Sequence, residues 1–314
     1  MLAFLVLAQE SCLKDNANNT NPAEGSNNVV EFQNSSIPVS YTSVYPQYSN
    51  GIILANDTGS FPINLNYTGA VLKTPQDINI TLTLDQVALD TFNSNQGTSY
   101  VIPPPDTYTL DTVTTIVKGT RQVTITVHVN VAPADYDYSA SYALPLTIKS
   151  ASYGVISSNF GTAIYSFIAR NKYDGSYAFR EKLVGWGFYG IDDGGTYTWP
   201  YNVGFATSGQ SSNTTIDNNV GYGSLQLAFT STGGATGFGA TMPQFTFDPA
   251  TDALVSVTNL TPPDTRNRAF AINPAVTDSR WDASTGTIYA AYIMTQTGRP
   301  TQYIYDTLTY KGVR

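Results

Sequence analysis

The chain has 314 residues, of which 41% are hydrophobic and only 12% are charged. Its net charge of −8 and its lack of any basic run exclude a nucleic-acid partner, because phosphate binding requires clustered Lys and Arg. The single cysteine excludes an internal disulfide, and the single histidine argues against a His-ligated metal site or a Ser-His-Asp triad. The length is sufficient for two domains, each with its own core.

The N-terminal segment has the order of a bacterial lipoprotein signal. Leu2–Ala8 is a strongly apolar run, too short to span a bilayer, and it is followed by Ser11 and Cys12. We predict that residues 1–12 are the remnant of such a signal, with its basic start upstream of Met1 and with Cys12 lipidated. Residues 13–28 are predicted to form a flexible tether. The alternative is an ordinary apolar start with an incidental buried cysteine.

Residues 29–170 show repeated alternation of apolar and polar positions. Asp77–Leu84, Gln122–Asn130 and Tyr142–Ile148 each place apolar side chains on one face, as in half-buried strands. The pattern puts His128 on the solvated face. Pro145 indicates an edge strand or a bulge. Short strands at this spacing predict a β-sandwich of immunoglobulin type.

One short helical turn is predicted over Val87–Asn93. A junction follows the sandwich at Asn171–Gly175, where Asp174-Gly175 is a turn signal. Beyond it, in residues 171–314, glycines and aromatics become dense. Gly-rich strands that bend strongly predict a small β-barrel. Its strands are expected at Ser224–Phe229, Gln244–Phe247, Leu254–Val257, Thr287–Ile293 and Tyr303–Tyr310.

A family resemblance rests on a distinctive series of segments: LNYTGAV (Leu65–Val71), DINITLTLD (Asp77–Asp85), ALDTFNSNQGTSY (Ala88–Tyr100), IPPPDTYTL (Ile102–Leu110), SYALPLTI (Ser141–Ile148), NKYDGSY (Asn171–Tyr177), WDASTGTIYAAY (Trp281–Tyr292) and YDTLTYKG (Tyr305–Gly312). The series resembles the uncharacterised surface lipoproteins of Bacteroidota that occur with glycan-uptake systems. The resemblance implies an immunoglobulin-like N-terminal domain and a lipocalin-like or lectin-like C-terminal domain. It also implies lipid anchoring at the outer membrane, exposure at the cell surface, and polysaccharide and importer components as partners.

Sugar sites combine aromatic faces with amides and carboxylates that bind hydroxyls. The densest such region supplies our predicted glycan-binding residues: Trp186, Tyr189, Asp192, Asp193, Tyr197, Trp199, Tyr201 and Asn202. Core packing of these rings is the alternative interpretation. Arg266 and Arg268, in the loop Pro262–Arg268, have the charge to meet an acidic sugar, but the sequence favours simple loop solvation for both.

The sequence favours a non-catalytic function without a cofactor. Glycoside hydrolysis uses two placed carboxyls, whereas Glu181 is the only glutamate after residue 170, and most aspartates there occupy turn contexts. The leading hypothesis is a glycan-binding accessory protein for polysaccharide uptake. The alternative is a structural or adhesive surface module that binds a protein partner. A hydrolase is the third and least favoured hypothesis.

Mass spectrometry of the mature protein from its native host tests the anchor. We expect an acylated Cys12 at the N-terminus, because in a lipoprotein the acylated cysteine becomes the first residue of the mature chain. An intact Met1 together with a free thiol at Cys12 would exclude the lipid anchor.

Overall fold

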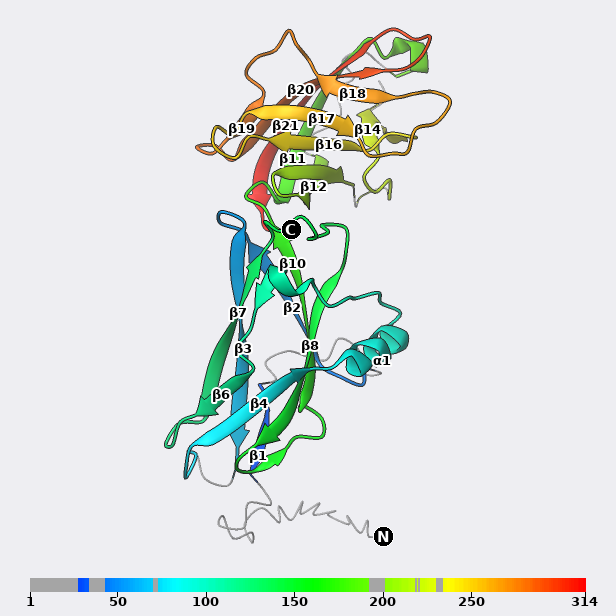
Figure 1. Cartoon of the computed structure of the whole chain (residues 1–314). Coiled ribbons are helices and arrows are strands. Elements are labelled where there is room, and N and C mark those ends of the chain that lie inside the picture. The colour runs from blue at the N-terminus through cyan, green and yellow to red at the C-terminus, as the bar shows by residue number, and fades with distance from the viewer. Residues whose placement is uncertain are drawn as a thin grey trace, which may run out of the picture.

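The computed structural model describes residues 28–33, 43–69, 73–191, 201–217, 219, 221–229 and 234–314. Over these residues the chain forms two β-structured bodies joined end to end (Figure 1). The strands between Val29 and Arg170 form a sandwich, and those between Gly175 and Gly312 form a barrel-like sheet. The predicted all-β architecture, a sandwich followed by a barrel, is therefore confirmed. The immunoglobulin-like and lipocalin-like descriptions remain predictions.

Two five-stranded sheets make up the sandwich. The first contains, in spatial order, β5 (Tyr108–Thr109), β7 (Gln122–Asn130), β3 (Thr58–Thr68), β1 (Val29–Phe32) and β9 (Val155–Ile156). The second contains β2 (Gln47–Ile53), β10 (Thr162–Arg170), β8 (Tyr142–Ala151), β4 (Ile78–Leu84) and β6 (Val113–Ile116). Neighbours are antiparallel except for the pairs β1–β9 and β2–β10, which are parallel.

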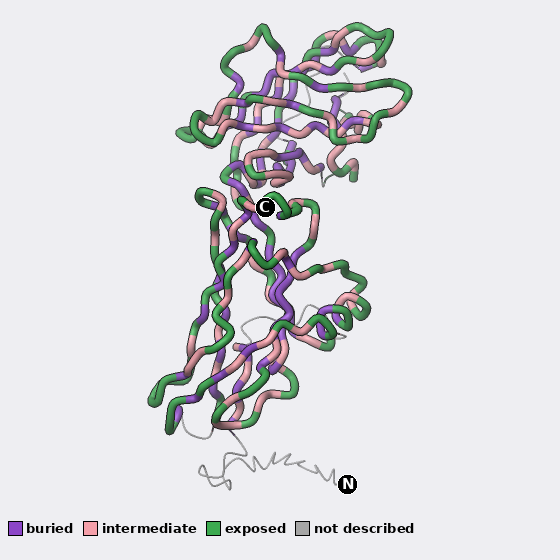
Figure 2. Tube along the Cα trace, viewed as in Figure 1, coloured by how far each residue is buried: buried purple, intermediate pink, exposed green. Residues whose placement is uncertain are grey.

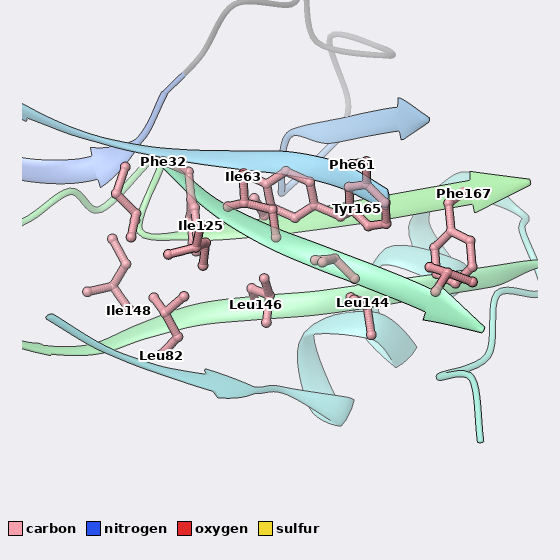
Figure 3. Packing of buried hydrophobic residues seen from close by; sticks show 14 of the residues in the cluster. Phe32, Phe61, Ile63, Leu82, Ile125, Leu144, Leu146, Ile148, Tyr165 and Phe167 are labelled. Atoms are coloured by element: carbon pink, nitrogen blue, oxygen red, sulfur yellow. The ribbon is translucent and has the colours of Figure 1, made fainter. Parts of the chain in front are cut away.

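Apolar side chains from both sheets meet between them and form the core of the sandwich (Figure 3). In β7, Ile125, Val127 and Val129 are at most 6% exposed, whereas His128 between them is exposed. The predicted alternation and the solvated position of His128 are therefore confirmed. Buried positions also gather inside the barrel (Figure 2), so each body has its own core.

Pro145 lies inside the second sheet, because β8 is flanked by β10 and β4. The prediction of an edge strand or bulge at this proline is wrong. Its carbonyl accepts a hydrogen bond from the Asp85 N–H at 3.0 Å, just after β4 has ended at Leu84. The N–H and C=O of a strand residue point to the same neighbour. The N–H that proline lacks would therefore face the Asp85 carbonyl, which instead accepts from the Leu89 N–H of α1 at 3.2 Å and is satisfied.

Within the described part of the chain, the one α-helix is α1 (Gln86–Gln96), accompanied by the 3₁₀ turns η3 (Pro105–Thr107) and η4 (Gly187–Tyr189). The Asp85 carboxylate caps α1 by accepting from the Ala88 N–H at 3.0 Å. Gly97, with φ of 66°, ends it in the left-handed conformation. Leu89 and Phe92 pack against the second sheet. These caps and contacts extend the helix beyond the single turn predicted.

A nine-stranded sheet curls into the barrel (Figure 1). It contains, in spatial order, β17 (Leu254–Asn259), β16 (Pro243–Phe247), β13 (Ser212–Ile216), β12 (Tyr201–Gly209), β11 (Gly175–Val184), β21 (Gln302–Gly312), β20 (Thr287–Thr295) and β18 (Ala269–Ile272), with β19 (Arg280–Asp282) also paired to β20. The Leu254 N–H donates to the Ser279 carbonyl, and the Trp281 N–H donates to the Asp252 carbonyl, both at 2.9 Å. These bonds join β17 to β19 and nearly close the sheet.

A separate hairpin of β14 (Gln226–Phe229) and β15 (Ala235–Phe238) contributes to the barrel core. Leu227 and Phe229 are each 2% exposed. All five strands expected in the second half of the chain are present: β14, β16, β17, β20 and β21.

The connector between β10 and β11 is bound to the barrel. The Lys172 ammonium lies 2.5 Å from an Asp252 carboxylate oxygen, and the Tyr173 hydroxyl donates to the same oxygen at 2.9 Å. Asp174 accepts hydrogen bonds from the Thr207 N–H at 2.8 Å and from its hydroxyl at 2.9 Å. The connector is thus a docked segment with fixed partners, which sets where the sandwich ends and the barrel begins.

Replacing the buried Leu146 by alanine tests the sandwich core. Leu146 is 0% exposed. Leu146→Ala should therefore lower the free energy of unfolding by about 3 kcal/mol in urea titrations. Val87→Ala on α1 removes a side chain that is 74% exposed and should change it by less than about 0.5 kcal/mol. Equal losses in the two variants would contradict the core assignment.

Candidate functional site

The aromatic segment predicted to bind glycan begins after β11, at the end of the barrel away from the sandwich (Figure 1). Trp186 is 0% exposed, and its indole N–H donates to the Tyr303 carbonyl at 3.3 Å. Tyr201 is 5% exposed, and its hydroxyl donates to Asp217 at 2.7 Å. A ring without an exposed face cannot lie against a sugar. In this structure Trp186 and Tyr201 are therefore core residues, as the alternative interpretation held.

Of the predicted residues that the structure describes, Tyr189 and Asn202 keep accessible surface. The Tyr189 ring is half-buried, packs edge to face on Phe238 with centroids 4.9 Å apart, and its hydroxyl donates to Gln296 at 3.3 Å. Asn202 is exposed, and its carbonyl accepts from the Asn219 amide at 2.5 Å. The remaining predicted residues lie outside the described residues, and their roles stay predictions: Asp192, Asp193, Tyr197, Trp199 and, for lipidation, Cys12.

A cleft of about 680 Å³ opens where the sandwich meets the barrel, and we call it the sandwich–barrel cleft. Its sandwich side is formed by β2, β10, Tyr100, Tyr136 and residues 138–141. Its barrel side is formed by β12, Ile216 of β13 and Arg314. Pockets for small ligands have volumes of roughly 300–1,000 Å³ and are frequent between domains. The cleft therefore has the size and the location of a ligand site.

Three tyrosine rings line the sandwich side of the cleft. Tyr136 is 8% exposed and packs against Tyr142 at 5.1 Å, which makes it part of the floor. Tyr138 meets Tyr136 edge to face at 5.0 Å and is half-buried, as is Tyr100. Half-buried rings combine a fixed position with some accessible surface. Tyr100 and Tyr138 are therefore the rings that can contact a ligand.

Hydroxyl and amide groups surround these rings. The Gln47 amide donates to the Tyr100 and Ser166 hydroxyls, both at 2.9 Å, and the Ser49 hydroxyl lies 3.1 Å from that of Ser166. The Tyr138 hydroxyl is buried and has no hydrogen-bond partner among the described residues. An unpaired buried hydroxyl costs about 1–3 kcal/mol. This hydroxyl has no accessible surface, so a ligand in the cleft can contact Tyr138 through its ring and not through its hydroxyl.

Burial, with a smaller effect of the Asp57 carboxylate, raises the pKa of Tyr138 to about 12. The hydroxyl therefore stays protonated across the physiological range, and Tyr138 presents an uncharged ring to the cleft.

Two guanidinium groups, Arg170 on the sandwich side and Arg314 on the barrel side, lie where the two sides of the cleft meet. Arg170 donates to the Arg314 carbonyl at 2.7 Å, and Arg314 lies 3.3 Å from Asp174, which is also 3.9 Å from Arg170. A Cβ on Gly51 would lie 3.3 Å from the Arg170 guanidinium carbon, so the lack of a side chain lets this group lie against β2. The cleft thus combines rings, hydroxyls and guanidinium donors whose charge Asp174 partly offsets.

Sequence reasoning did not identify this cleft. Its lining residues come from segments between Ser49 and Arg314, and the fold alone brings them together. The one local signal is the pair Tyr136 and Tyr138, two tyrosines spaced by two between strands. Such a pair is also common in ordinary loops, so the sequence does not distinguish the two.

Inside the barrel, two carboxyl groups lie side by side. Glu181 of β11 and Asp306 of β21 are direct cross-strand partners and are 8% and 3% exposed. Glu181 accepts from the Gln226 amide at 2.9 Å. The Tyr292 hydroxyl lies 2.9 Å from the Gln226 carbonyl oxygen and 2.8 Å from Asp306. The Tyr292 hydroxyl has one proton and can donate it to only one of these two oxygens. Both contacts are satisfied when Tyr292 donates to Gln226 and a protonated Asp306 donates to Tyr292.

The environment agrees with this protonation. Burial, reinforced by the neighbouring Asp306, raises the pKa of Glu181 well above its usual range, and burial raises the pKa of Asp306 to about 8. Two adjacent carboxyls in a dry interior cannot both ionise, so the pair keeps at least one proton at neutral pH. Enclosure in the barrel core assigns the pair to a buried polar network and separates it from the sandwich–barrel cleft.

The alternation of the two strands contained a signal for this pair. Glu181 lies between inward-facing Phe179 and Leu183, and Asp306 lies between inward-facing Ile304 and Leu308. A period of two places both carboxyls on the buried face. Sequence reasoning recorded Glu181 only as a rare residue type and missed its position.

None of the described helices is long and apolar enough to cross a membrane. Among the described residues, no group of three or more His, Cys, Asp or Glu side chains is arranged to hold a metal ion.

A family model described as an N-terminal domain matches residues 28–154, a range that lies within the sandwich. No curated protein matches the chain. The match supports the resemblance inferred for the first half of the sequence.

Solved structures from Bacteroides have a similar fold. One protein of unknown function from Bacteroides ovatus is 14% identical and has a TM-score of 0.58, over 91% of this chain and 95% of its own. A second from the same species is 14% identical with a TM-score of 0.52, over 90% and 94% of the two chains. An auxiliary nutrient binding protein from Bacteroides thetaiotaomicron is 15% identical with a TM-score of 0.48, over 88% and 94%. At these identities the similarity concerns the fold alone.

The buried acid pair generates a pH prediction. The pKa of Asp306 is higher in the folded chain, about 8, than its ordinary value of 3.8, so folding stability falls as pH rises between these values. For each proton that the folded chain holds and the unfolded chain does not, the free energy of unfolding falls by up to about 1.4 kcal/mol per pH unit. Asp306→Asn should reduce this slope and raise stability at pH 8, measured by urea denaturation across pH 4–9.

The matched control is Asp278→Asn, because the Asp278 side chain is 78% exposed. This variant should keep the wild-type pH dependence. A wild-type slope in Asp306→Asn would show that the pair is not the origin of the dependence.

Proposed function

We propose that the protein is a non-catalytic, carbohydrate-binding lipoprotein of the cell surface that acts as an accessory to polysaccharide uptake. The observation that carries the proposal is the sandwich–barrel cleft, with its tyrosine rings and polar rim. Sugars present apolar C–H faces beside many hydroxyls. A site with aromatic faces next to uncharged donors and acceptors suits both parts of such a ligand.

The fixed connector supports a preformed site. Asp174 is bonded to Thr207 on the barrel and lies beside Arg170 on the sandwich, so the two walls of the cleft are held together. A preformed pocket avoids the entropic cost of ordering its walls when a ligand binds. This matters for sugars, whose binding energy is divided over many weak contacts.

The proposed location follows from the N-terminal segment. A lipidated Cys12 followed by a tether over residues 13–28 would hold the cleft outside the outer membrane. There the protein would meet polysaccharide before an importer does. The importer components are proposed partners, and the lipid chain is the proposed contact with the membrane.

Binding to a panel of polysaccharides and oligosaccharides, measured by affinity electrophoresis and calorimetry, tests the function. Tyr138→Ala removes a ring from the cleft and should weaken binding of the best glycan about tenfold or more. Tyr138→Phe keeps the ring and removes the unpaired hydroxyl. It should bind glycan as the wild type does, because the ring that lines the cleft is kept and the hydroxyl is buried away from the ligand.

Tyr289→Ala is the matched control, because Tyr289 is 40% exposed on the barrel and does not line the cleft. It should bind glycan as the wild type does. Failure of the whole panel, or identical affinity for wild type and Tyr138→Ala, would contradict the proposed site.

A further inference from the structure

The end of the barrel away from the sandwich carries a row of rings and guanidinium groups. We call it the distal rim and define it by Phe188, Tyr189, Phe238, Arg268, Gln296 and Arg299. These residues come from η4, β15, the segment before β18, and the turn between β20 and β21. Since β11 starts beside the sandwich, this turn after β11 lies at the far end of the barrel (Figure 1).

One side of the distal rim is an exposed stack. The guanidinium carbon of Arg299 lies 3.9 Å from the centre of the Phe188 ring. Phe188 is 54% exposed, and it meets Tyr189 edge to face at 5.4 Å. A cation over a ring face is favourable by roughly 0.5–1 kcal/mol at an exposed site. The stack therefore holds Arg299 flat while its N–H edges stay accessible.

The other side of the distal rim is a second stack, held more firmly. The guanidinium carbon of Arg268 lies 4.0 Å from the centre of the Phe238 ring. Its Nε donates to Gln296 at 2.8 Å, and the same Gln296 oxygen accepts from the Tyr189 hydroxyl at 3.3 Å. Gln296 thus links the two sides and fixes the orientation of Arg268.

Within the described part of the chain, no carboxylate lies at ion-pair distance from either arginine. In the same loop, Arg266 is paired with Asp264 at 2.5 Å. Among the described residues, neither Arg268 nor Arg299 forms an ion pair. In a chain with a net charge of −8, two cations beside an exposed ring are a local exception, and among the described residues only the Asp264 carboxylate, already paired with Arg266, acts on Arg268 from farther away. They favour an anionic ligand.

We propose that the distal rim is a second binding site, and that it takes a saccharide bearing carboxylate or sulfate groups. The Arg299 guanidinium lies flat on its ring and directs its N–H groups outward in one plane, the geometry that binds a carboxylate or sulfate through two parallel hydrogen bonds. Arg268 already donates to Gln296 and to the Gly239 carbonyl and contributes mainly its charge. The exposed Phe188 beside it offers a face to the sugar ring. The inference rests on the proposal that the protein binds carbohydrate, but its residues are separate from those of the cleft.

Calorimetric titrations with dextran sulfate and with oligogalacturonate, each compared with neutral dextran, test the inference on the full chain. Wild type should bind the anionic glycans more tightly than dextran, and added salt should weaken this binding. Arg299→Ala should lower affinity for the anionic glycans about tenfold, the effect of losing one charge-assisted contact. Arg299→Lys keeps the charge but not the planar fork and should recover only part of the affinity.

Arg280→Ala is the matched control. Arg280 also lies over a ring, 5.7 Å from the centre of Tyr289, but it lies close to Asp278 and Asp282 and is therefore compensated. Its replacement should leave anionic binding unchanged. An equal loss in Arg280→Ala, or equal affinity of wild type for dextran sulfate and dextran, would overturn the inference.

The variants test the two proposed sites independently of each other. Tyr138→Ala, which alters the cleft, should leave dextran sulfate binding intact if the distal rim is the anionic site. Loss of that binding in Tyr138→Ala, with wild-type affinity in Arg299→Ala, would move the anionic ligand to the cleft and overturn the inference. Anionic binding that depends on Arg299, with no Tyr138-dependent ligand in the whole panel, would support the distal rim and contradict the cleft.

Discussion

The carboxylate of Asp174 is the contact on which the arrangement of the two bodies depends. Its side chain is 1% exposed, and it accepts two hydrogen bonds from Thr207 while lying beside Arg170 and Arg314. A buried carboxylate is stable only when it is surrounded by donors in this way. Because Arg170 ends the last sandwich strand and Thr207 belongs to the barrel, this one group joins the bodies across their junction.

The residue that follows strengthens the same constraint. A Cβ on Gly175 would lie 2.4 Å from the Tyr310 ring, so the first residue of β11 must be glycine for Tyr310 to pack there. With Asp174 and Gly175 both fixed, the chain enters the barrel in one direction. The sandwich–barrel cleft has walls on both bodies, so its shape depends on the direction in which the chain enters the barrel. The distal rim, at the other end of β11, is independent of it.

The parts of the fold that follow from local pattern could be predicted, and the parts that follow from assembly could not. The alternation of β7 determined its bounds and the exposure of His128, because one face of a strand is buried and the other is solvated. Pro145 was misplaced because its tolerance depends on where β4 ends, which is a property of the neighbouring strand. The same kind of alternation in β11 predicts that Glu181 is buried. Its partner Asp306 lies 125 residues later in the chain, so the local pattern around Glu181 does not indicate the pairing.

Aromatic density had two explanations that sequence alone could not separate. Trp186 packs inside the barrel, whereas Phe188, two residues later, is exposed under Arg299. The difference arises from η4, which turns the chain at the barrel end so that neighbouring rings face opposite ways. The sequence does not reveal the cleft for a related reason. Its sandwich wall and its barrel wall come from separate segments of the chain, and the junction at Asp174 brings them together.

A crystal structure of the full chain with its best neutral oligosaccharide tests the central claim most directly. We predict electron density for the sugar in the sandwich–barrel cleft, with a sugar face on Tyr138 or Tyr100 and hydrogen bonds to the surrounding hydroxyls. A sugar bound elsewhere on the molecule, with the cleft left to solvent at saturating ligand, would contradict the account.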